Sequence, residues 1–198
     1  GDWLTPKVNG IFRFDKPPLI YWLMGFFYAL PKNEIWDTFG TLSARLPSAL
    51  GSLFLMLMIG DTLFCWPQKG DRQSLTPILA SLSFALSPFI IIWSRTAVSD
   101  ALLTGTLGIS LLLFWRRMAS DNGDQCILAW VFLGFAILTK GPVAFVLATL
   151  TITFFLFSQK DRKTLLYKIN PKKGFLITIL ISVPWYILEL IKEGKPFW

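Results

Sequence analysis

The sequence predicts an all-α integral membrane protein, a polytopic bundle of about six transmembrane helices with one further helix at the membrane surface. Of its 198 residues, 54% are hydrophobic and only 16% are charged, whereas soluble domains carry about 25% charged residues. The hydrophobic residues gather into runs of about 15 to 23 residues, and a helix of such a length spans a bilayer. Short charged segments separate these runs. The composition therefore excludes a soluble enzyme.

Six segments are long and apolar enough to cross the membrane: 42–64, 75–93, 98–115, 125–139, 143–157 and 174–191. The fourth and fifth segments are shorter than the roughly 20 residues that a span requires, so we expect tilt or shifted boundaries there. A seventh apolar run, 19–30, would reach only about 18 Å as a helix. We expect it to lie at the membrane surface, so that 1–41 forms an external loop and 42–198 the transmembrane bundle.

Basic residues predict the orientation of this bundle. The connection 158–173 is rich in lysine and arginine, and the positive-inside rule places it in the cytoplasm. Its basic residues are Lys160, Arg162, Lys163, Lys168, Lys172 and Lys173. Alternation of the spans then places the connections 94–100 and 140–142 outside, on the same side as the predicted external loop.

Several kinds of partner and site are disfavoured. The chain contains no histidine, and Cys65 and Cys126 are too far apart in sequence to suggest a zinc motif. The net charge of +7 comes from basic residues in the loops, where they anchor the topology and contact lipid phosphates. Membrane lipids are therefore the expected partners, and nucleic acid is not.

The first polar motif is Asp15-Lys16, directly before Pro17-Pro18 at the start of the run 19–30. Two successive prolines hold the backbone extended at Lys16, which gives a rigid charged corner. A lysine at a membrane surface can hold a lipid phosphate, and a neighbouring carboxylate can bind a divalent cation or orient a hydroxyl group. The alternative is a plain ion pair between the two side chains at the start of a helix.

The second motif lies in the connection 94–100, which contains Arg95, Ser99 and Asp100. A carboxylate at the mouth of a transmembrane helix is costly unless it is paired, hydrated or functional. Asp100 is therefore a candidate for chemistry. The alternative is a structural role, in which Ser99 or Asp100 caps the helix and Arg95 is the counter-ion.

The third motif is Thr139-Lys140-Gly141-Pro142, between two short spans. Gly141 can take a left-handed turn, and Pro142 can open the following helix. Lys140 would then either cap the end of its helix or approach an anionic lipid headgroup.

Together these motifs resemble the glycosyltransferases of the GT-C superfamily that use polyprenyl-phosphate sugars. The resemblance is to families 39 and 83, which include the bacterial lipid A aminoarabinose transferase and proteins similar to protein O-mannosyltransferases. The matching stretches follow the order of the family along the chain. They are 1–6, 9–10, 14–19, 45–50, 94–100, 139–141 and 184–186.

The resemblance implies transfer of a sugar from a polyprenyl-phosphate donor to a hydroxyl group of a lipid A-like lipid, a protein or a glycan. The reaction would take place on the external, periplasmic face of the bacterial inner membrane. By resemblance, Lys16 would hold the donor phosphate, and Asp100 would be a catalytic carboxylate. Asp15 would be a second one and a ligand for a divalent metal ion, the one cofactor that the family suggests.

We add Arg95 and Lys140 as further contacts to phosphate and Tyr21 as a contact to substrate. The resemblance also implies that a principal catalytic carboxylate lies upstream of Gly1 and a histidine-containing loop beyond Trp198, so we expect this piece alone to be inactive. The alternative is a transporter or flippase that binds a polyprenyl or phospholipid carrier without chemistry. Such a protein should carry charges inside several spans, whereas apart from Arg45 and Asp100 at the starts of their spans only Asp61 and Glu189 lie there, both close to span ends.

Overall fold

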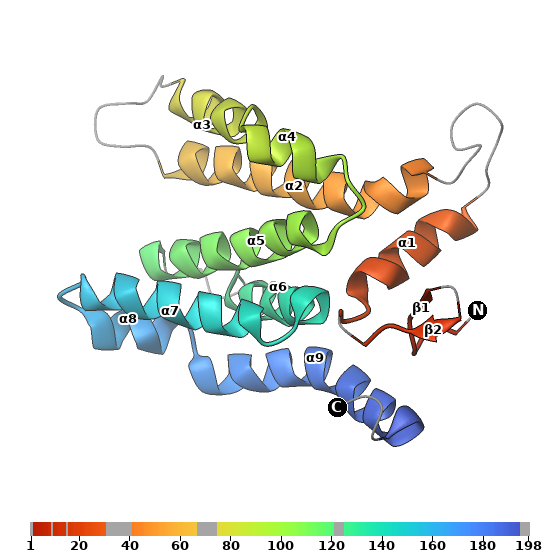
Figure 1. Ribbon diagram of the computed structural model, residues 1–198. Helices are drawn as coiled ribbons and strands as arrows, with labels where there is room; N and C mark the ends of the chain where they lie inside the picture. The colour runs from red at the N-terminus through yellow and green to blue at the C-terminus, as the bar shows by residue number, and fades with distance from the viewer. Residues whose placement is uncertain are drawn as a thin grey trace.

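The computed structural model describes residues 2–8, 10–14, 16–30, 41–66, 75–120 and 125–194, and it is almost wholly helical (Figure 1). The strands are β1 (Lys7–Val8) and β2 (Ile11–Phe12). The helices are α1 (Leu19–Ala29), α2 (Thr41–Cys65), α3 (Thr76–Ala85), α4 (Pro88–Ser94), α5 (Ser99–Ala119), α6 (Gln125–Lys140), α7 (Val143–Phe157), α8 (Arg162–Lys168) and α9 (Pro171–Glu193). The predicted all-α class is confirmed, with one small antiparallel hairpin of β1 and β2 added.

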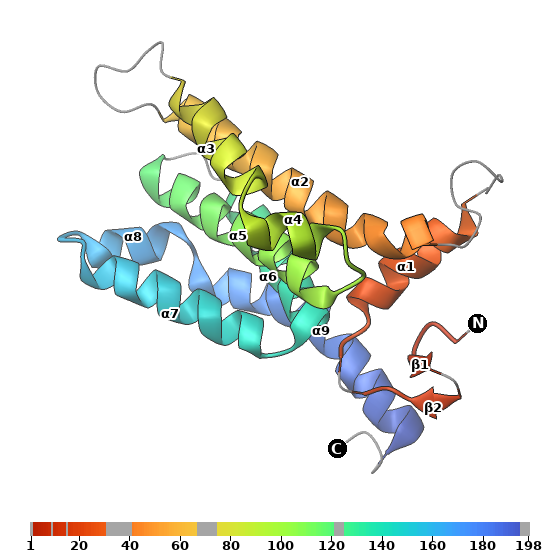
Figure 2. The same cartoon turned by 45° about the horizontal axis from the view of Figure 1, so that its top comes forward.

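Helix α5 lies in the middle of the bundle, between α2 on one side and α6 on the other, and α6 in turn packs on α9 (Figure 1). Helix α1 packs against α2, and the hairpin lies beside the last turns of α9 (Figure 2). The core gathers around Phe114, which is fully buried and meets the Trp130 ring edge to face at 4.8 Å between centroids. The core therefore lies between α5, α6 and their neighbours.

Small residues let α2 and α5 approach closely. A Cβ atom added at Gly105 would lie 2.5 Å from the carbonyl oxygen of Gly51. Ser48 and Ser52, on the same side of α2, are also buried. Membrane helices use such small residues to bring their backbones together, because no hydrophobic effect between helices drives association in lipid.

The predicted span 98–115 is too short at its far end, because α5 runs from Ser99 to Ala119 and carries Arg116 into the buried interface with α2. The guanidinium of Arg116 donates to Asp61 Oδ2 at 2.6 Å and to Thr62 Oγ1 at 2.8 Å, and it lies over the Trp66 ring. A buried arginine is tolerated when it is paired and hydrogen-bonded in this way. These partners on α2 therefore allow α5 to continue beyond residue 115, where the predicted span ends.

The predicted span 75–93 consists of two helices, α3 and α4, which are bent by 60° relative to each other. The break lies at Leu86 and Ser87, directly before Pro88. A proline cannot donate to the preceding turn and disfavours helical geometry in the residue before it, and Ser87 accordingly has φ −59° and ψ 128°. The predicted loop 158–173 also contains a helix, α8.

Some of the predicted spans correspond to helices that are both long enough and apolar enough to cross a membrane, and others do not. Among the described residues, α2 and α9 are long and apolar enough to cross a membrane, and the bent pair α3 and α4 would add a third span. The apolar helices α6 and α7 have 16 and 15 residues, and α1 has 11. The number of crossings and the surface location of α1 stay predictions.

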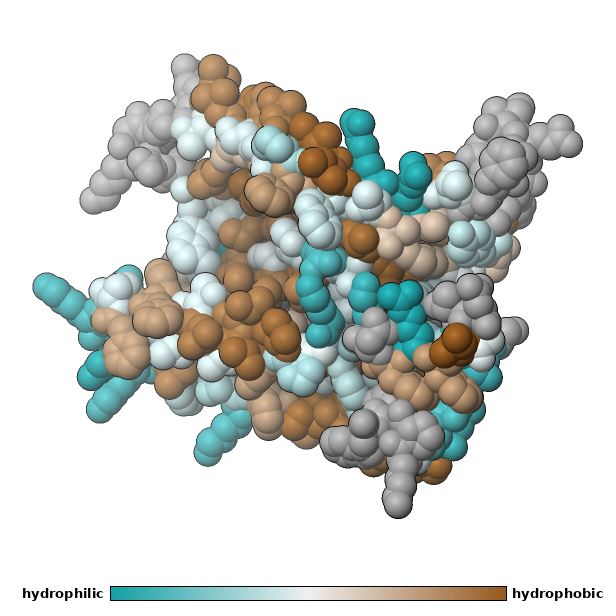
Figure 3. Space-filling view, in the orientation of Figure 1, coloured by the Kyte–Doolittle hydropathy of each residue, from teal (hydrophilic) through white to brown (hydrophobic). Residues whose placement is uncertain are grey.

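The surface fits a lipid environment. Hydrophobic side chains gather over α3 and over α7, whereas hydrophilic ones gather around α8 at one end of the bundle (Figure 3). Large apolar side chains are widely exposed there, as at Ile78 on α3 (58%) and Phe154 on α7 (71%). Such a surface would be unfavourable in water and is expected in contact with acyl chains.

The close contact of α2 and α5 generates a prediction about stability. We expect Gly105→Ala to lower the thermal stability of the protein in detergent, because the added methyl meets backbone atoms of Gly51 that cannot move aside. Overpacking costs about 1–3 kcal/mol, which exceeds the gain of up to about 1 kcal/mol from replacing a glycine within a helix.

The control is Thr104→Ala on the same helix, whose exposed hydroxyl donates only to the carbonyl of Asp100. Melting temperatures would be measured for both variants by intrinsic fluorescence. Equal melting temperatures for Gly105→Ala and the control would show that the two backbones do not meet at this point.

Candidate active site

The polar motifs of the sequence meet at one end of the bundle, opposite to α8 (Figure 1). Lys16 precedes α1 there, Asp100 lies in the first turn of α5, and Lys140 ends α6. This confirms that the three motifs share one end. Asp15 lies outside the described residues. Its predicted role as a ligand for a divalent metal ion therefore stays a prediction.

An ion pair links two of these motifs. The Lys140 ammonium donates to Asp100 Oδ1, which joins the end of α6 to the start of α5. Both side chains remain more than a third exposed, at 41% and 38%. The pair is therefore within reach of a ligand as well as structural.

The structure differs from the predicted structural role of Asp100, in which Ser99 or Asp100 caps the helix and Arg95 is the counter-ion. The N-cap of α5 is Val98, and neither Ser99 nor Asp100 caps the helix through its side chain. The counter-ion of Asp100 is Lys140, and not Arg95. Arg95 instead ends α4 on the exposed surface. Lys140 is 40 residues away from Asp100, so that no local pattern could have shown the pair.

The turn at Gly141 brings the first motif to this ion pair. Gly141 has φ +81°, the left-handed conformation that the sequence predicted. A Cβ atom there would lie 3.6 Å from the Tyr186 hydroxyl and 3.9 Å from Cγ of Pro17. Since Pro17 follows Lys16 directly, the charged corner lies beside the end of α6.

Lys16 itself is half-buried and precedes two buried prolines. Within the described part of the chain, no ion pair or hydrogen bond of its ammonium is recorded. The rigid Pro17-Pro18 corner limits how far the backbone at Lys16 can move. This arrangement offers one positive charge to an anionic ligand, beside a carboxylate that is already paired.

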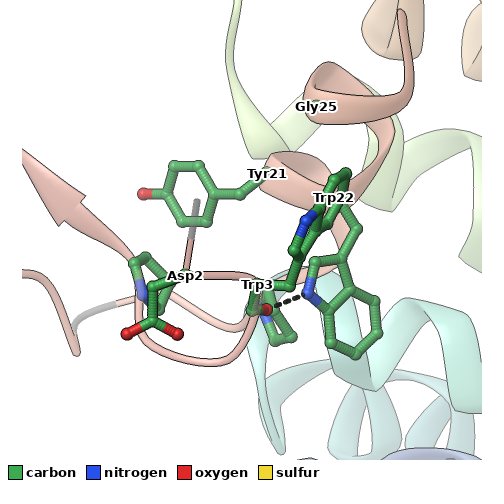
Figure 4. Close-up of a pocket in the computed structure, with 7 residues that line it drawn as sticks. Asp2, Trp3, Tyr21, Trp22 and Gly25 are labelled. Atoms are coloured by element: carbon green, nitrogen blue, oxygen red, sulfur yellow. Dashed lines mark hydrogen bonds between the residues drawn. The ribbon is translucent and has the colours of Figure 1, made fainter. Parts of the chain in front are cut away.

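Tyr21 does not join this cluster but lines a separate cavity of about 240 Å³ under the N-terminal segment. Figure 4 shows Tyr21 and Trp22 extending from α1 toward Asp2 and Trp3. Trp22 Nε1 donates to the carbonyl oxygen of Trp3 at 2.6 Å. Gly25 completes the wall, where a Cβ atom would meet the Trp3 ring at 2.8 Å.

Sequence reasoning missed the contacts that hold the N-terminal segment on α9. Glu189 is fully buried, and its Oε2 lies 3.2 Å from the Thr5 hydroxyl. Lys192 donates to Asp2 Oδ2 at 2.6 Å and to Thr5 Oγ1 at 2.8 Å. Trp185 Nε1 donates to the carbonyl oxygen of Leu4 at 2.9 Å.

We use the name N-terminal clamp for Asp2, Leu4 and Thr5 together with the residues of α9 that they contact, which are Trp185, Glu189, Lys192 and Glu193. The spacing of Glu189, Lys192 and Glu193 on one helix face was a visible signal of a polar cluster. Within the described residues, no group of three or more His, Cys, Asp or Glu side chains could hold a metal ion. The acidic residues of the clamp contact Thr5 and Lys192.

The ion pair in the clamp generates a prediction about pH. The hydrogen bond from Lys192, with the backbone N–H of Thr5, lowers the pKa of Asp2 from 3.8 to about 2. A depressed carboxyl pKa stabilises the folded state above the unfolded value, and this stabilisation is lost as the pH falls toward the folded value. Asp2→Asn should therefore melt at a lower temperature than the natural chain at neutral pH.

The difference in melting temperature should shrink as the pH approaches 3.8 and falls further, and it should vanish only once the pH is below about 2. Asp161→Asn is the control, because this exposed carboxylate lies at the opposite end of the bundle and forms no ion pair with the other described residues. A difference between Asp2→Asn and the natural chain that persists unchanged to the lowest pH would contradict the ion pair.

The chain is similar in sequence to several known proteins. The chain is 31% identical to undecaprenyl phosphate-alpha-4-amino-4-deoxy-L-arabinose arabinosyl transferase 1 of Pseudomonas fluorescens, over 100% of this chain and 34% of that protein. It is 34% identical to an uncharacterized protein of Aquifex aeolicus, over 100% of this chain and 41% of that protein. The chain therefore spans less than half the length of these relatives.

The fold is similar to that of ArnT from Cupriavidus metallidurans. The crystal structure in the apo state has a TM-score of 0.84, with 22% identity over 98% of this chain and 35% of that chain. The structure of ArnT bound to undecaprenyl phosphate has a TM-score of 0.76, with the same identity and coverage. At this level of identity the likeness establishes the fold, that of a multi-pass membrane protein.

The family model described as dolichyl-phosphate-mannose-protein mannosyltransferase matches residues 15–188. The match begins at the charged corner and ends beside Glu189, so it includes Lys16, Asp100 and Lys140. Because it covers most of the sequence, the chain belongs to the dolichyl-phosphate-mannose-protein mannosyltransferase family.

Proposed function

We propose that these residues are part of a membrane glycosyltransferase that moves a sugar from a polyprenyl-phosphate donor to a hydroxyl group. The acceptor would be a lipid A-like lipid, a protein or a glycan, and the reaction would take place on the external face of the bacterial inner membrane. The single observation that carries the proposal is the cluster at the end of α6. There Lys16, which has no charged partner among the described residues, adjoins the ion pair of Asp100 and Lys140 through Pro17 and Gly141.

The chemistry of the donor explains why such a cluster is needed. In the transfer, the bond between the sugar carbon and the phosphate oxygen breaks, and the acceptor oxygen forms a new bond to that carbon. The acceptor proton goes to a carboxylate, and the polyprenyl phosphate leaves with its negative charge. A fixed positive charge where this charge develops lowers the barrier, because it needs no reorganisation during the reaction.

In this proposal Lys16 binds the donor phosphate, and Asp100 supports the reacting centre as a carboxylate that Lys140 orients. Lys140 then acts mainly through Asp100, and a direct contact with phosphate is its secondary role. Arg95 lies on the exposed surface directly after α4. Tyr21 lines the cavity under the N-terminal segment. They are proposed as contacts to outer parts of the substrates.

The distribution of charge supports the proposed external location of the cluster. The opposite end of the bundle carries Lys160, Arg162, Lys163, Lys168, Lys172 and Lys173 around α8 and the start of α9. The positive-inside rule favours the cytoplasm for that end. The proposed reaction then takes place at the external end, where Asp100 lies.

The transporter or flippase alternative is not favoured. The charges found inside the helices are held by local partners, Arg116 by Asp61 and Thr62, and Glu189 by Thr5. These contacts fix helix ends and the N-terminal segment, whereas a transport path requires charges that line a cavity across the membrane. The names of the curated relatives also describe transferases.

Replacement of Lys16 tests the assigned role. Lys16→Ala should lower the rate of transfer by about 10²–10³-fold, because it removes a fixed charge that stabilises the leaving phosphate. The measurement is transfer of radiolabelled sugar from undecaprenyl phosphate to acceptor, in the longest natural chain that contains these residues. Membrane insertion and folding should be unchanged.

Lys7→Ala is the matched control, since Lys7 belongs to the same N-terminal region and is exposed, with its ammonium 4.9 Å from the centroid of the Phe12 ring. It removes the same charge at a distance from the cluster. A Lys16→Ala protein with natural activity, or an equal loss in both variants, would remove the assigned role of Lys16.

A double-mutant cycle tests the pairing in function. Asp100→Asn and Lys140→Met should each lower the rate, and the double variant should lose less than the product of the two effects. Residues that act as one unit are non-additive in this way. Lys140→Arg should restore part of the activity, because it keeps the positive charge beside Asp100. Fully independent effects would mean that the two residues act separately.

A further inference from the structure

A second cavity lies at the end of the bundle opposite to the candidate active site. It has a volume of about 430 Å³ and opens between the end of α5, the start of α6 and the junction of α8 and α9. We call it the basic cavity. Neither the proposed reaction nor the motifs of the sequence account for it.

The polar side chains that line the basic cavity are Arg117, Lys168, Asn170 and Lys173. No carboxylate is among its described lining residues. Arg117 and Lys173 are two cations that share a small space and repel each other, and an anion that neutralises them is bound favourably. The charge of the lining therefore selects for a negatively charged ligand.

Arg117 is already oriented for such a ligand. Its Nε donates to the carbonyl oxygen of Lys168 at 3.1 Å, and its Nη1 donates to that of Ser120 at 3.3 Å. These two bonds fix the guanidinium plane, and Nη2 is left without a partner in the described part of the chain. Lys173 is exposed on the first turn of α9 and has no ion pair there. A phosphate between the two side chains would receive charged hydrogen bonds from both.

The rest of the lining is apolar and rigid. Ile127, Trp130 and Ile177 form the wall toward the interior of the bundle. Trp130 Nε1 donates to the carbonyl oxygen of Ile169 at 2.8 Å. A Cβ atom at Gly174 would lie 2.0 Å from the indole, so that only glycine fits there. The wall thus exists before a ligand binds.

The wall also continues onto the hydrophobic surface. Ile127 is 57% exposed, on the outer side of α6. Tyr167, at the mouth of the basic cavity, is 87% exposed, and tyrosine is enriched where a membrane meets water. A free phosphate ion would gain nothing from this apolar wall, whereas the glycerol and acyl chains of a phospholipid would be buried against it.

We propose that the basic cavity binds an anionic membrane phospholipid. Its phosphate lies between Arg117 and Lys173, with Lys168 as a further cation, and its acyl chains follow the wall of Ile127, Trp130 and Ile177. Basic pockets between transmembrane helices are known to bind such headgroups. The inference is independent of the proposed sugar transfer, because it concerns the other end of the bundle.

The test is native mass spectrometry of the full chain, released from vesicles that contain equal amounts of phosphatidylglycerol and phosphatidylcholine. We expect one phosphatidylglycerol molecule to remain bound in preference to phosphatidylcholine. Arg117→Gln with Lys173→Gln should lower this preference by at least about fivefold, since each lysine or arginine near an anionic membrane contributes such a factor.

Lys160→Gln with Arg162→Gln is the matched control. It removes one lysine and one arginine from the same end of the bundle but none from the lining of the basic cavity. We expect it to keep the preference for phosphatidylglycerol. An equal loss in both double variants would indicate general attraction to the surface and would overturn the proposed site.

Two further measurements keep the test decisive. Lys173→Glu changes one exposed side chain without a recorded bond, so it should lower the preference even if loss of Arg117 impairs folding. Inorganic phosphate, added as a soluble competitor, should not displace the bound lipid. Displacement by phosphate alone, or an unchanged preference in Lys173→Glu, would contradict a phospholipid site.

Discussion

The close approach of α5 to α2 is the constraint on which the rest of the structure depends. Gly105 meets the backbone of Gly51. In the last turn of α5, Arg116 donates to Asp61 and Thr62 across the same interface. Glycine and a paired arginine leave little freedom for sliding or rotation of the two helices. Helix α5 also packs against α6 on its other side, and that second contact brings Asp100 to Lys140.

The two ends of the bundle have opposite kinds of polar chemistry. At the end that holds Asp100, each acidic residue described is paired or hydrogen-bonded, as in the ion pair with Lys140 and in the N-terminal clamp. At the end with α8, arginine and lysine are in excess. The two proposals follow this difference in charge: the proposed reaction lies at the end with the Asp100–Lys140 ion pair, and the proposed lipid site lies at the basic end.

The N-terminal clamp explains how a short segment without a helix is held in place. The backbone carbonyls of Trp3 and Leu4 accept from Trp22 and Trp185, and Asp2 and Thr5 contact Lys192 and Glu189. Buried polar groups of this kind are costly unless they are paired. Their pairing joins the first and last described elements, and it positions the segment that leads to Lys16.

The sequence by itself determined the helical membrane class, the short helix after Pro18 and the common end of the three polar motifs. Composition, helix length and proline chemistry are local properties, so they can be read from neighbouring residues. The break between α3 and α4 could also be predicted from Pro88, but the predicted span 75–93 did not include it.

The tertiary structure alone decided which polar groups pair. Lys140 rather than Arg95 faces Asp100, Arg116 is buried against α2, and Glu189 meets Thr5 from the opposite end of the chain. Each of these contacts depends on how helices far apart in sequence pack in space. Pairing energies are short-ranged and require partners at a few ångströms, and no local pattern of residues specifies which distant helix supplies them.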